Sequence, residues 1–286
     1  MARIDTIVDW ILTERCNLNC YYCLQNADTR KEECGPVDFS FISGLDDTVL
    51  FHLTGGEPFL VPNIIDLCNG LQEGGHFVSM NTNMTLPVGR FAENVRSGNF
   101  LFINASVHYP YRKHHMDPFM RHFRQLRDKG FFVYATVVMI PAEFDEIVEF
   151  IKEYQRQGLI LLPKLMRGIE LGRRYPASYS ETQNEIMKQL VASAIDNMTA
   201  AEKEKFQIAC ENNVSIDNWW EFDSKSRCGT RCFDGTRYVR ITERGDIVYC
   251  DGKVLGNVKE TGFKKLDQAC QCQYYDKALC TNKSIY

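Results

Sequence analysis

Short apolar runs alternate with amphipathic stretches through the first 165 residues of the chain. The apolar runs predict strands and the amphipathic stretches predict helices, an alternation that indicates βα units and a parallel sheet. Six strands are expected, near Thr6–Leu12, Val49–Thr54, Phe77–Thr82, Leu101–Val107, Phe132–Ile140 and Leu159–Lys164. Helices are expected between them, at Ile64–Gln72, Phe91–Ser97, Pro118–Lys129 and Asp145–Gln157.

Gly130 and Gly158 stand where a helix should end and the next strand begin, as expected for left-handed caps. Six βα repeats are fewer than the eight of a closed barrel, so the pattern predicts a sheet that forms an open arc. Functional groups on such a sheet gather at the carboxyl ends of its strands.

The pattern changes after residue 165. Residues 166–218 contain a basic irregular stretch and then two expected helices, Glu181–Asn197 and Thr199–Glu211, which we interpret as a helical bridge. Residues 219–286 are rich in cysteine and contain two short β runs, Tyr238–Thr242 and Ile247–Cys250, which predict a hairpin. The chain is therefore expected to be an α/β core (1–165), a bridge, and a small α+β domain.

Three cysteines, Cys16, Cys20 and Cys23, follow the first predicted strand with the spacing C-x3-C-x2-C. Three thiolates can hold three corners of an iron–sulfur cube and leave one iron without a protein ligand. A structural zinc site is less consistent, because it normally has four ligands and no fourth lies nearby in sequence. Disulfides are disfavoured because no secretory signal precedes the loop, and three ordinary thiols stay an alternative.

This loop resembles the C-x3-C-x-aromatic-C signature of the radical SAM (S-adenosylmethionine) superfamily, with Tyr22 at the aromatic position. A second resemblance lies in Gly55, Gly56, Glu57 and Pro58, which follow the second predicted strand where that superfamily has its GGEP motif. The resemblance implies a partial (β/α)6 TIM barrel, a SAM-binding [4Fe-4S] cluster on the three cysteines, and SAM as a cofactor. It also implies an oxidoreductase that makes a 5'-deoxyadenosyl radical by reductive cleavage of SAM.

The resemblance further implies which residues contact SAM. Tyr22 would lie beside the adenine, the glycines would let the backbone approach the cofactor, Glu57 would accept from the SAM ammonium, and Pro58 would fix the turn. Polar contacts are implied for Asn83 and Ser106, at the ends of the third and fourth strands, although both could simply be turn residues. His108 stands where many relatives have an aspartate, so it is a candidate catalytic residue or a strand-end polar residue.

Six cysteines in the last 59 residues suggest a second site. The opening C-x3-C-x17-C, with Gly245 before its third cysteine, is similar to the SPASM and twitch modules that bind an auxiliary [4Fe-4S] cluster. The departure from a full SPASM pattern favours one auxiliary cluster over two. A zinc ribbon is the alternative. The candidate ligands are Cys228, Cys232, Cys250, Cys270, Cys272 and Cys280.

Composition limits the partners. A net charge of -4 gives no sign of a nucleic-acid or membrane surface, and no apolar run approaches the roughly 18 residues of a membrane span. Twelve cysteines without a secretory signal favour metal over disulfides and a cytoplasmic location. Four basic residues after the last predicted strand could hold an anionic substrate, or could lie on a solvated face: Lys164, Arg167, Arg173 and Arg174.

We expect oxidation or dehydrogenation of a small molecule, and the resemblance implies a reducing partner such as flavodoxin or ferredoxin. The first strand begins within ten residues of Met1, which tilts the expectation away from a leader-peptide-binding domain. Radical modification or crosslinking of a ribosomally made peptide or protein is the alternative. A non-enzymatic alternative is an iron–sulfur or zinc protein that binds a partner or carries electrons.

Overall fold

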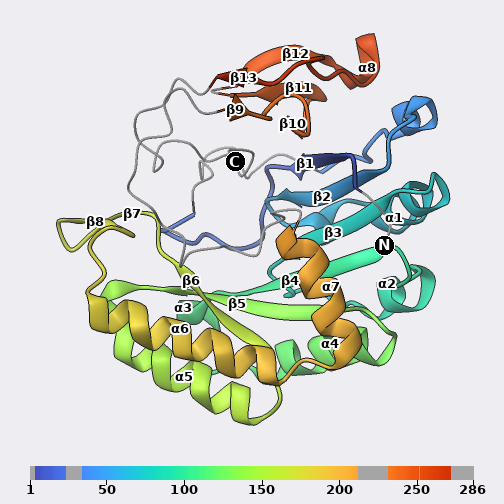
Figure 1. Ribbon diagram of the computed structural model, residues 1–286. Coiled ribbons are helices and arrows are strands. Elements are labelled where there is room, and N and C mark those ends of the chain that lie inside the picture. Colours follow the sequence, from blue (N-terminus) through green and yellow to red (C-terminus); the bar gives the residue numbers. More distant parts are fainter. Residues whose placement is uncertain (1–3, 24–33, 212–230, 251, 272–286) are drawn as a thin grey trace.

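The computed structural model describes residues 4–23, 34–211, 231–250 and 252–271. Its main sheet has nine strands in the order β12-β11-β10-β1-β2-β3-β4-β5-β6, and neighbours from β1 to β6 pair in parallel (Figure 1). The six parallel strands are β1 (Thr6–Thr13), β2 (Val49–Gly55), β3 (Phe77–Thr82), β4 (Phe100–Val107), β5 (Val133–Met139) and β6 (Leu161–Leu165). This confirms the predicted α/β fold with an open arc of six βα units.

Burial on both faces explains why the central strands are continuous apolar runs. Every residue from Val49 to Leu53 in β2 is buried, and so is every residue from Phe100 to Ala105 in β4. Large aromatic side chains fill the space around them: Phe51, Phe102 and Tyr134 are fully buried. The sheet therefore provides a rigid base from which the strand ends project.

Helices cover the outer face of the parallel strands. They are α1 (Ile64–Glu73), α2 (Gly89–Asn94), α4 (Asp117–Asp128) and α5 (Phe144–Arg156), with the short α3 (Tyr109–Arg112) after β4. Gly130 and Gly158 follow α4 and α5 with φ of 84° and 83°, which confirms the predicted left-handed caps. The expected helix to Ser97 is three residues too long, because Val95 already has an extended backbone.

The predicted bridge helices are α6 (Glu181–Asp196) and α7 (Ala200–Glu211). A capping box of Ser180 and Gln183 begins α6, which packs on α5 and β6. In α7, Glu202 forms a bidentate ion pair with Arg127 (2.8 and 2.7 Å). Lys205 of the same helix donates to the carbonyl of Phe100 (3.0 Å) at the start of β4. The bridge therefore supports the amino end of β4.

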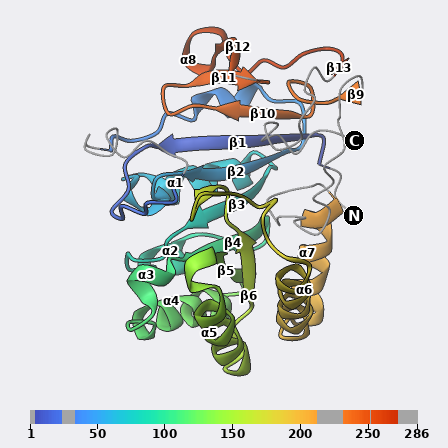
Figure 2. The ribbon, with the colours of Figure 1, turned by 90° about the vertical axis from the view of Figure 1, so that its left-hand side faces the viewer.

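The predicted tail hairpin is present as β10 (Tyr238–Ile241) and β11 (Asp246–Tyr249), extended by β12 (Lys253–Asn257) and followed by α8 (Val258–Thr261). The local sequence pattern predicted the hairpin but not its position in the fold. Strand β10 pairs in parallel with β1, so the tail strands continue the barrel sheet, with β12 uppermost and β6 lowest in Figure 2.

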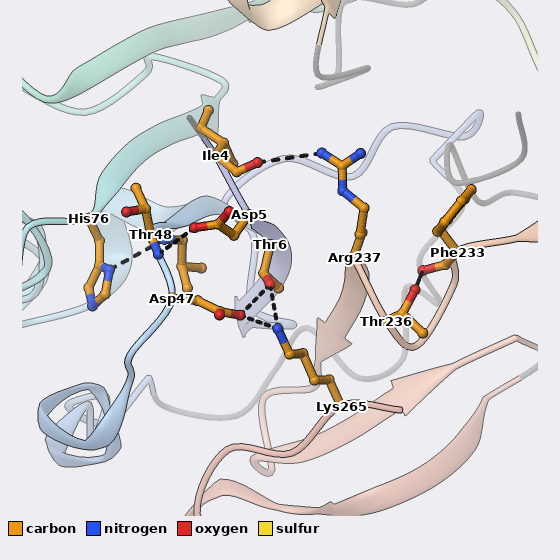
Figure 3. Close-up of polar contacts among 11 residues, drawn as sticks. Ile4, Asp5, Thr6, Asp47, Thr48, His76, Phe233, Thr236, Arg237 and Lys265 are labelled. Atoms are coloured by element: carbon orange, nitrogen blue, oxygen red, sulfur yellow. Dashed lines mark hydrogen bonds and ion pairs between the residues drawn. The ribbon is translucent and has the colours of Figure 1, made fainter. Parts of the chain in front are cut away.

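Polar contacts reinforce this junction at the start of β1. Lys265 forms an ion pair with Asp47 and a hydrogen bond with Thr6, and Arg237 donates to the carbonyl of Ile4 (3.4 Å; Figure 3). The tail is thus attached to the barrel by backbone pairing and by side chains.

Several short elements complete the described chain. They are the 3-10 turns η2 (Ser40–Gly44), η3 (Pro58–Leu60) and η4 (Pro141–Glu143), the hairpin of β7 (Gly168–Glu170) and β8 (Arg173–Tyr175), and the ribbon of β9 (Arg231–Cys232) and β13 (Cys270–Gln271). None of the helices in the described part of the chain is both long enough and apolar enough to cross a membrane.

Candidate functional site

One pocket of about 320 Å³ opens at the carboxyl ends of the parallel strands. It brings together residues from the loop after β1 and from the ends of β2, β3, β4, β5 and β6, as expected when the carboxyl ends of parallel strands meet at one edge. Eight residues expected from the sequence to bind cluster or cofactor line it: Cys16, Cys20, Tyr22, Cys23, Gly55, Gly56, Asn83 and Ser106. The candidate catalytic residue His108 lines it as well.

The loop of three cysteines is tied to its neighbours by hydrogen bonds. The side chain of Asn17 donates to Thr85 (2.7 Å) and accepts from Asn83 (2.8 Å), and the Tyr111 hydroxyl donates to the carbonyl of Asn19 (2.8 Å). The Asn83 amide also lies 3.7 Å from the Cys16 sulfur. The end of β3 therefore fixes the loop that carries the thiols.

Gly55 and Gly56 have a structural role that the sequence analysis missed. A Cβ on Gly56 would lie 1.8 Å from the carbonyl oxygen of Arg15, and one on Gly55 would lie 2.3 Å from that of Thr13. Two backbone hydrogen bonds join the same two segments. The amide of Gly56 donates to the carbonyl of Thr13 (2.7 Å), and the amide of Glu57 donates to the carbonyl of Arg15 (2.8 Å). The glycines let the end of β2 pack against the backbone that leads into the cysteine loop.

Glu57 is fully buried and, with Pro58, lies outside the pocket lining. Its carboxylate accepts hydrogen bonds from the backbone of Asn83 (2.7 Å) and Phe59 (3.0 Å) and from the Thr82 hydroxyl (2.7 Å). Burial raises the pKa of this carboxyl above its ordinary value. Both carboxylate oxygens therefore accept hydrogen bonds from the protein itself. In this conformation Glu57 is not placed for the expected contact with a SAM ammonium.

His108 directly follows β4, and its side chain contacts the cysteine loop. Its Nδ1 lies 3.2 Å from the Cys20 sulfur and 3.0 Å from the Tyr22 hydroxyl oxygen. The rings of His108 and Tyr22 are stacked, with centroids 6.0 Å apart and planes at 22°. Burial and the adjacent Cys20 raise the pKa of the Tyr22 phenol above its ordinary value.

A chain of polar side chains crosses the inner face of the sheet below the pocket. His52 bonds to Ser79 (2.8 Å) and to Asn81 (2.8 Å), Asn104 donates to Asn81 (2.9 Å), and Thr136 donates to Asn104 (2.9 Å). This network was not expected from the sequence, although each member is a polar residue within an apolar strand. It gives the pocket a polar floor.

Arg112 is a second feature that the sequence did not indicate. It is buried in α3 and donates to the carbonyls of Asn83 and Met84 (3.2 Å each), while its guanidinium lies 5.4 Å from the centre of the Phe119 ring. Arg112 therefore connects the end of β4 to the loop after β3.

The chemistry of the pocket fits an iron–sulfur cluster with a polar cofactor. Three thiols line one wall, and Asn83 and Ser106 offer polar groups beside them. Within the described ranges, no three His, Cys, Asp or Glu side chains converge as ligands of a single ion do. The corners of a cube bind separate irons, so their sulfurs need not converge on one point.

The tail cysteines are described only in part. Cys228, Cys272 and Cys280 lie outside the described residues. Cys232 and Cys270 are directly opposite one another in the β9–β13 ribbon. The backbone amide of Cys250, which has a φ of 21°, donates to Asp234 (2.6 Å), two residues after Cys232.

Comparisons with known proteins agree with this geometry. The model of the Radical SAM superfamily matches residues 10–154, just over half of the chain. The AdoMet-dependent heme synthase of Methanosarcina barkeri is 22% identical over 300 residues, covering 93% of this chain and 83% of that protein. An uncharacterized protein of Methanocaldococcus jannaschii, MJ0907, is 32% identical over 97 residues, which are 30% of this chain and 32% of that relative's length.

Solved structures share the fold. Native anSMEcpe with bound AdoMet has a TM-score of 0.58 at 14% identity, and the match covers 90% of this chain and 79% of that one. Streptococcus suis SuiB bound to its precursor peptide SuiA has a TM-score of 0.57 at 12% identity, covering 91% and 64% of the two chains. The strand order, the cysteine loop and the family match together show that this chain is a member of the Radical SAM superfamily.

Proposed function

We propose that the chain holds a [4Fe-4S] cluster on Cys16, Cys20 and Cys23 and cleaves SAM reductively. The cluster, when bound, supplies one electron to the SAM sulfonium, so that a carbon–sulfur bond breaks into methionine and a 5'-deoxyadenosyl radical that takes hydrogen from a substrate. The observation that carries this proposal is the meeting of all three thiols with Asn83 and Ser106 in one pocket.

The protein's own residues would hold and orient the cofactor. Asn83 and Ser106 offer polar contacts at the ends of β3 and β4, and Tyr22 would flank the adenine. Glu57 would act indirectly, because its carboxylate holds the backbone amide of Asn83. Thr82, which donates to the same carboxylate, would share this positioning role.

The proposed reaction is oxidation or dehydrogenation of a small molecule. The heme synthase relative matches over nearly the whole chain and is named for a small-molecule product, which supports this choice over peptide modification. Lys164 and Arg167 line the pocket, and no Asp or Glu of the described residues does. Arg173 and Arg174, the other two basic candidates, are exposed in β8 and do not line it. This favours a substrate with an anionic group, so carboxylic acids are the first candidates for deuterium transfer into 5'-deoxyadenosine.

Anaerobic reconstitution tests the proposal. Reduction of the reconstituted protein with dithionite in the presence of SAM should yield 5'-deoxyadenosine and methionine. Replacement of Cys16, Cys20 and Cys23 together by Ala should abolish both products. Cys34→Ala is the matched control and should leave them unchanged, because Cys34 does not line the pocket.

Two results would overturn the proposal. One is an intact, reducible cluster that gives no 5'-deoxyadenosine, which is what the non-enzymatic alternative predicts. The other is continued cleavage of SAM in the triple variant.

We also propose an auxiliary [4Fe-4S] cluster in the tail and an external reductant of the flavodoxin or ferredoxin type. Two contacts support the auxiliary cluster. Cys232 and Cys270 are register partners in the β9–β13 ribbon, and the Cys250 amide donates to Asp234, two residues after Cys232, so three of the candidate ligands lie in one region. Cys228, Cys272 and Cys280 stay candidates from sequence. The zinc ribbon stays the alternative for this region.

A further inference from the structure

His108 combines a fixed position with a contact to one cluster-binding thiol. Its backbone carbonyl accepts hydrogen bonds from the amides of Tyr111 (2.9 Å) and Arg112 (3.1 Å) at the start of α3. Arg112 in turn holds the loop after β3 through the carbonyls of Asn83 and Met84. The imidazole is therefore placed by two strand ends and stacked on Tyr22.

The proton on Nδ1 can be assigned from its neighbours. A cysteine sulfur that binds iron is a thiolate and has no proton to donate. An unprotonated Nδ1 at 3.2 Å from that sulfur would place two acceptors in contact, which is unfavourable. The arrangement is favourable when Nδ1 carries the proton and donates to Cys20.

Tyr22 does not remove this donor. Its oxygen lies 3.0 Å from the same nitrogen, where it can accept a share of the Nδ1 proton.

We propose that His108 is a positioning residue that donates its Nδ1 proton to the Cys20 thiolate and so makes the SAM-binding cluster easier to reduce. The proposal rests on the proposed function, since it takes Cys20 as a ligand of that cluster. A hydrogen bond to a ligand sulfur stabilises the more negative, reduced state and is one of the levers that set the potential of an iron–sulfur cluster. His108 then affects the start of the chemistry through the cluster.

The test is a redox titration of the reconstituted full chain, followed by electron paramagnetic resonance. The signal of the SAM-binding cluster is identified as the one that SAM perturbs, and the titration itself is run without SAM. His108→Leu removes the donor and keeps an apolar side chain of similar size. His108→Asn keeps an N–H donor near the position of Nδ1.

At the wild-type midpoint, His108→Leu should lower the ratio of reduced to oxidised cluster about tenfold, which is about 59 mV for one electron. His108→Asn should keep the ratio within about twofold of wild type, about 18 mV on the same scale. A drop smaller than about fivefold in the Leu variant, about 41 mV, would overturn the proposal. So would an equal drop in both variants, because the effect would then come from packing.

The experiment also separates this inference from the proposed function. Wild-type protein that forms 5'-deoxyadenosine while the Leu variant titrates normally refutes only the role of His108. Wild-type protein without a SAM-perturbed cluster refutes both.

Discussion

At the scale of single residues, Gly56 and Glu57 act on the protein's own backbone. Gly56 packs against the carbonyl of Arg15, and Glu57 accepts from the amides of Asn83 and Phe59. The motif thereby joins the end of β2 to the cysteine loop on one side and to the end of β3 on the other. In this structure the motif therefore positions the segments that line the pocket relative to one another.

Gly56→Ala tests this role. The added Cβ would meet the Arg15 carbonyl at 1.8 Å, and because backbone cannot move aside cheaply, we expect a loss of about 1–3 kcal/mol in the free energy of unfolding. Iron bound per chain after reconstitution should fall as well, since the same shift displaces the cysteine loop. Chemical denaturation and iron analysis measure the two effects.

Gly44→Ala is the control for that prediction. A Cβ at Gly44 would have no atom within 4 Å, so the free energy of unfolding should change by no more than about 0.5 kcal/mol. Equal effects of the two substitutions would contradict the close-packing explanation.

At the scale of elements, the pairing of β10 with β1 joins the tail to the barrel. Asp9 of β1 is the register partner of Arg240 and forms an ion pair with it (3.5 Å). Asp9 also accepts from the Tyr238 hydroxyl (3.0 Å). Burial and the Asp9 carboxylate raise the pKa of the Tyr238 phenol, so Tyr238 keeps the proton that it donates.

Asp9→Ala should weaken the pairing of β1 with β10 more than removal of the ion pair between Lys265 and Asp47 would. It leaves the Tyr238 hydroxyl and the Arg240 guanidinium without this shared acceptor, at a cost of about 1–3 kcal/mol. Amide hydrogen exchange in β10 and urea denaturation should both report the loss.

Lys265→Ala is the comparison. Lys265 and Asp47 are about one-third exposed (38% and 32%), so their ion pair should contribute only about 0–1 kcal/mol. A larger loss in the Lys265 variant than in the Asp9 variant would show that the peripheral contact, and not the strand junction, holds the tail.

At the scale of the whole molecule, the continuous sheet fixes the tail relative to the pocket. Nine strands run from β12 to β6, and Cys16, Cys20 and Cys23 follow β1, the strand that β10 pairs with. Strands β10 to β12 are therefore part of the sheet whose ends line the pocket, whereas β9 and β13, which contain Cys232 and Cys270, form a separate two-stranded ribbon.

Iron analysis tests the two-cluster arrangement. Reconstituted wild-type protein should contain about eight irons per chain, and the triple variant of Cys16, Cys20 and Cys23 about four. A variant with Cys232 and Cys250 replaced by Ala should also contain about four and should keep the SAM-perturbed signal. About four irons in wild type, with zinc in addition, would replace the auxiliary cluster by a zinc ribbon.

The sequence by itself determined the βα alternation and part of the pocket lining. Local periodicity fixes strand and helix type, and parallel strands must bring their carboxyl ends to one edge, so Cys16, Gly56, Asn83 and Ser106 were predictable neighbours. The bridge helices and the tail hairpin followed from the same short-range signals. These features depend on residues close together in the chain.

Only the tertiary structure decided the contacts between distant segments. The pairing of Val8 with Val239 joins residues about 230 positions apart, and no periodicity encodes such a partner. The inward direction of Glu57, the support from Arg112 and the contact of His108 with Cys20 likewise depend on where separate strands end in space. A motif specifies which groups are present, whereas packing decides which atoms they meet.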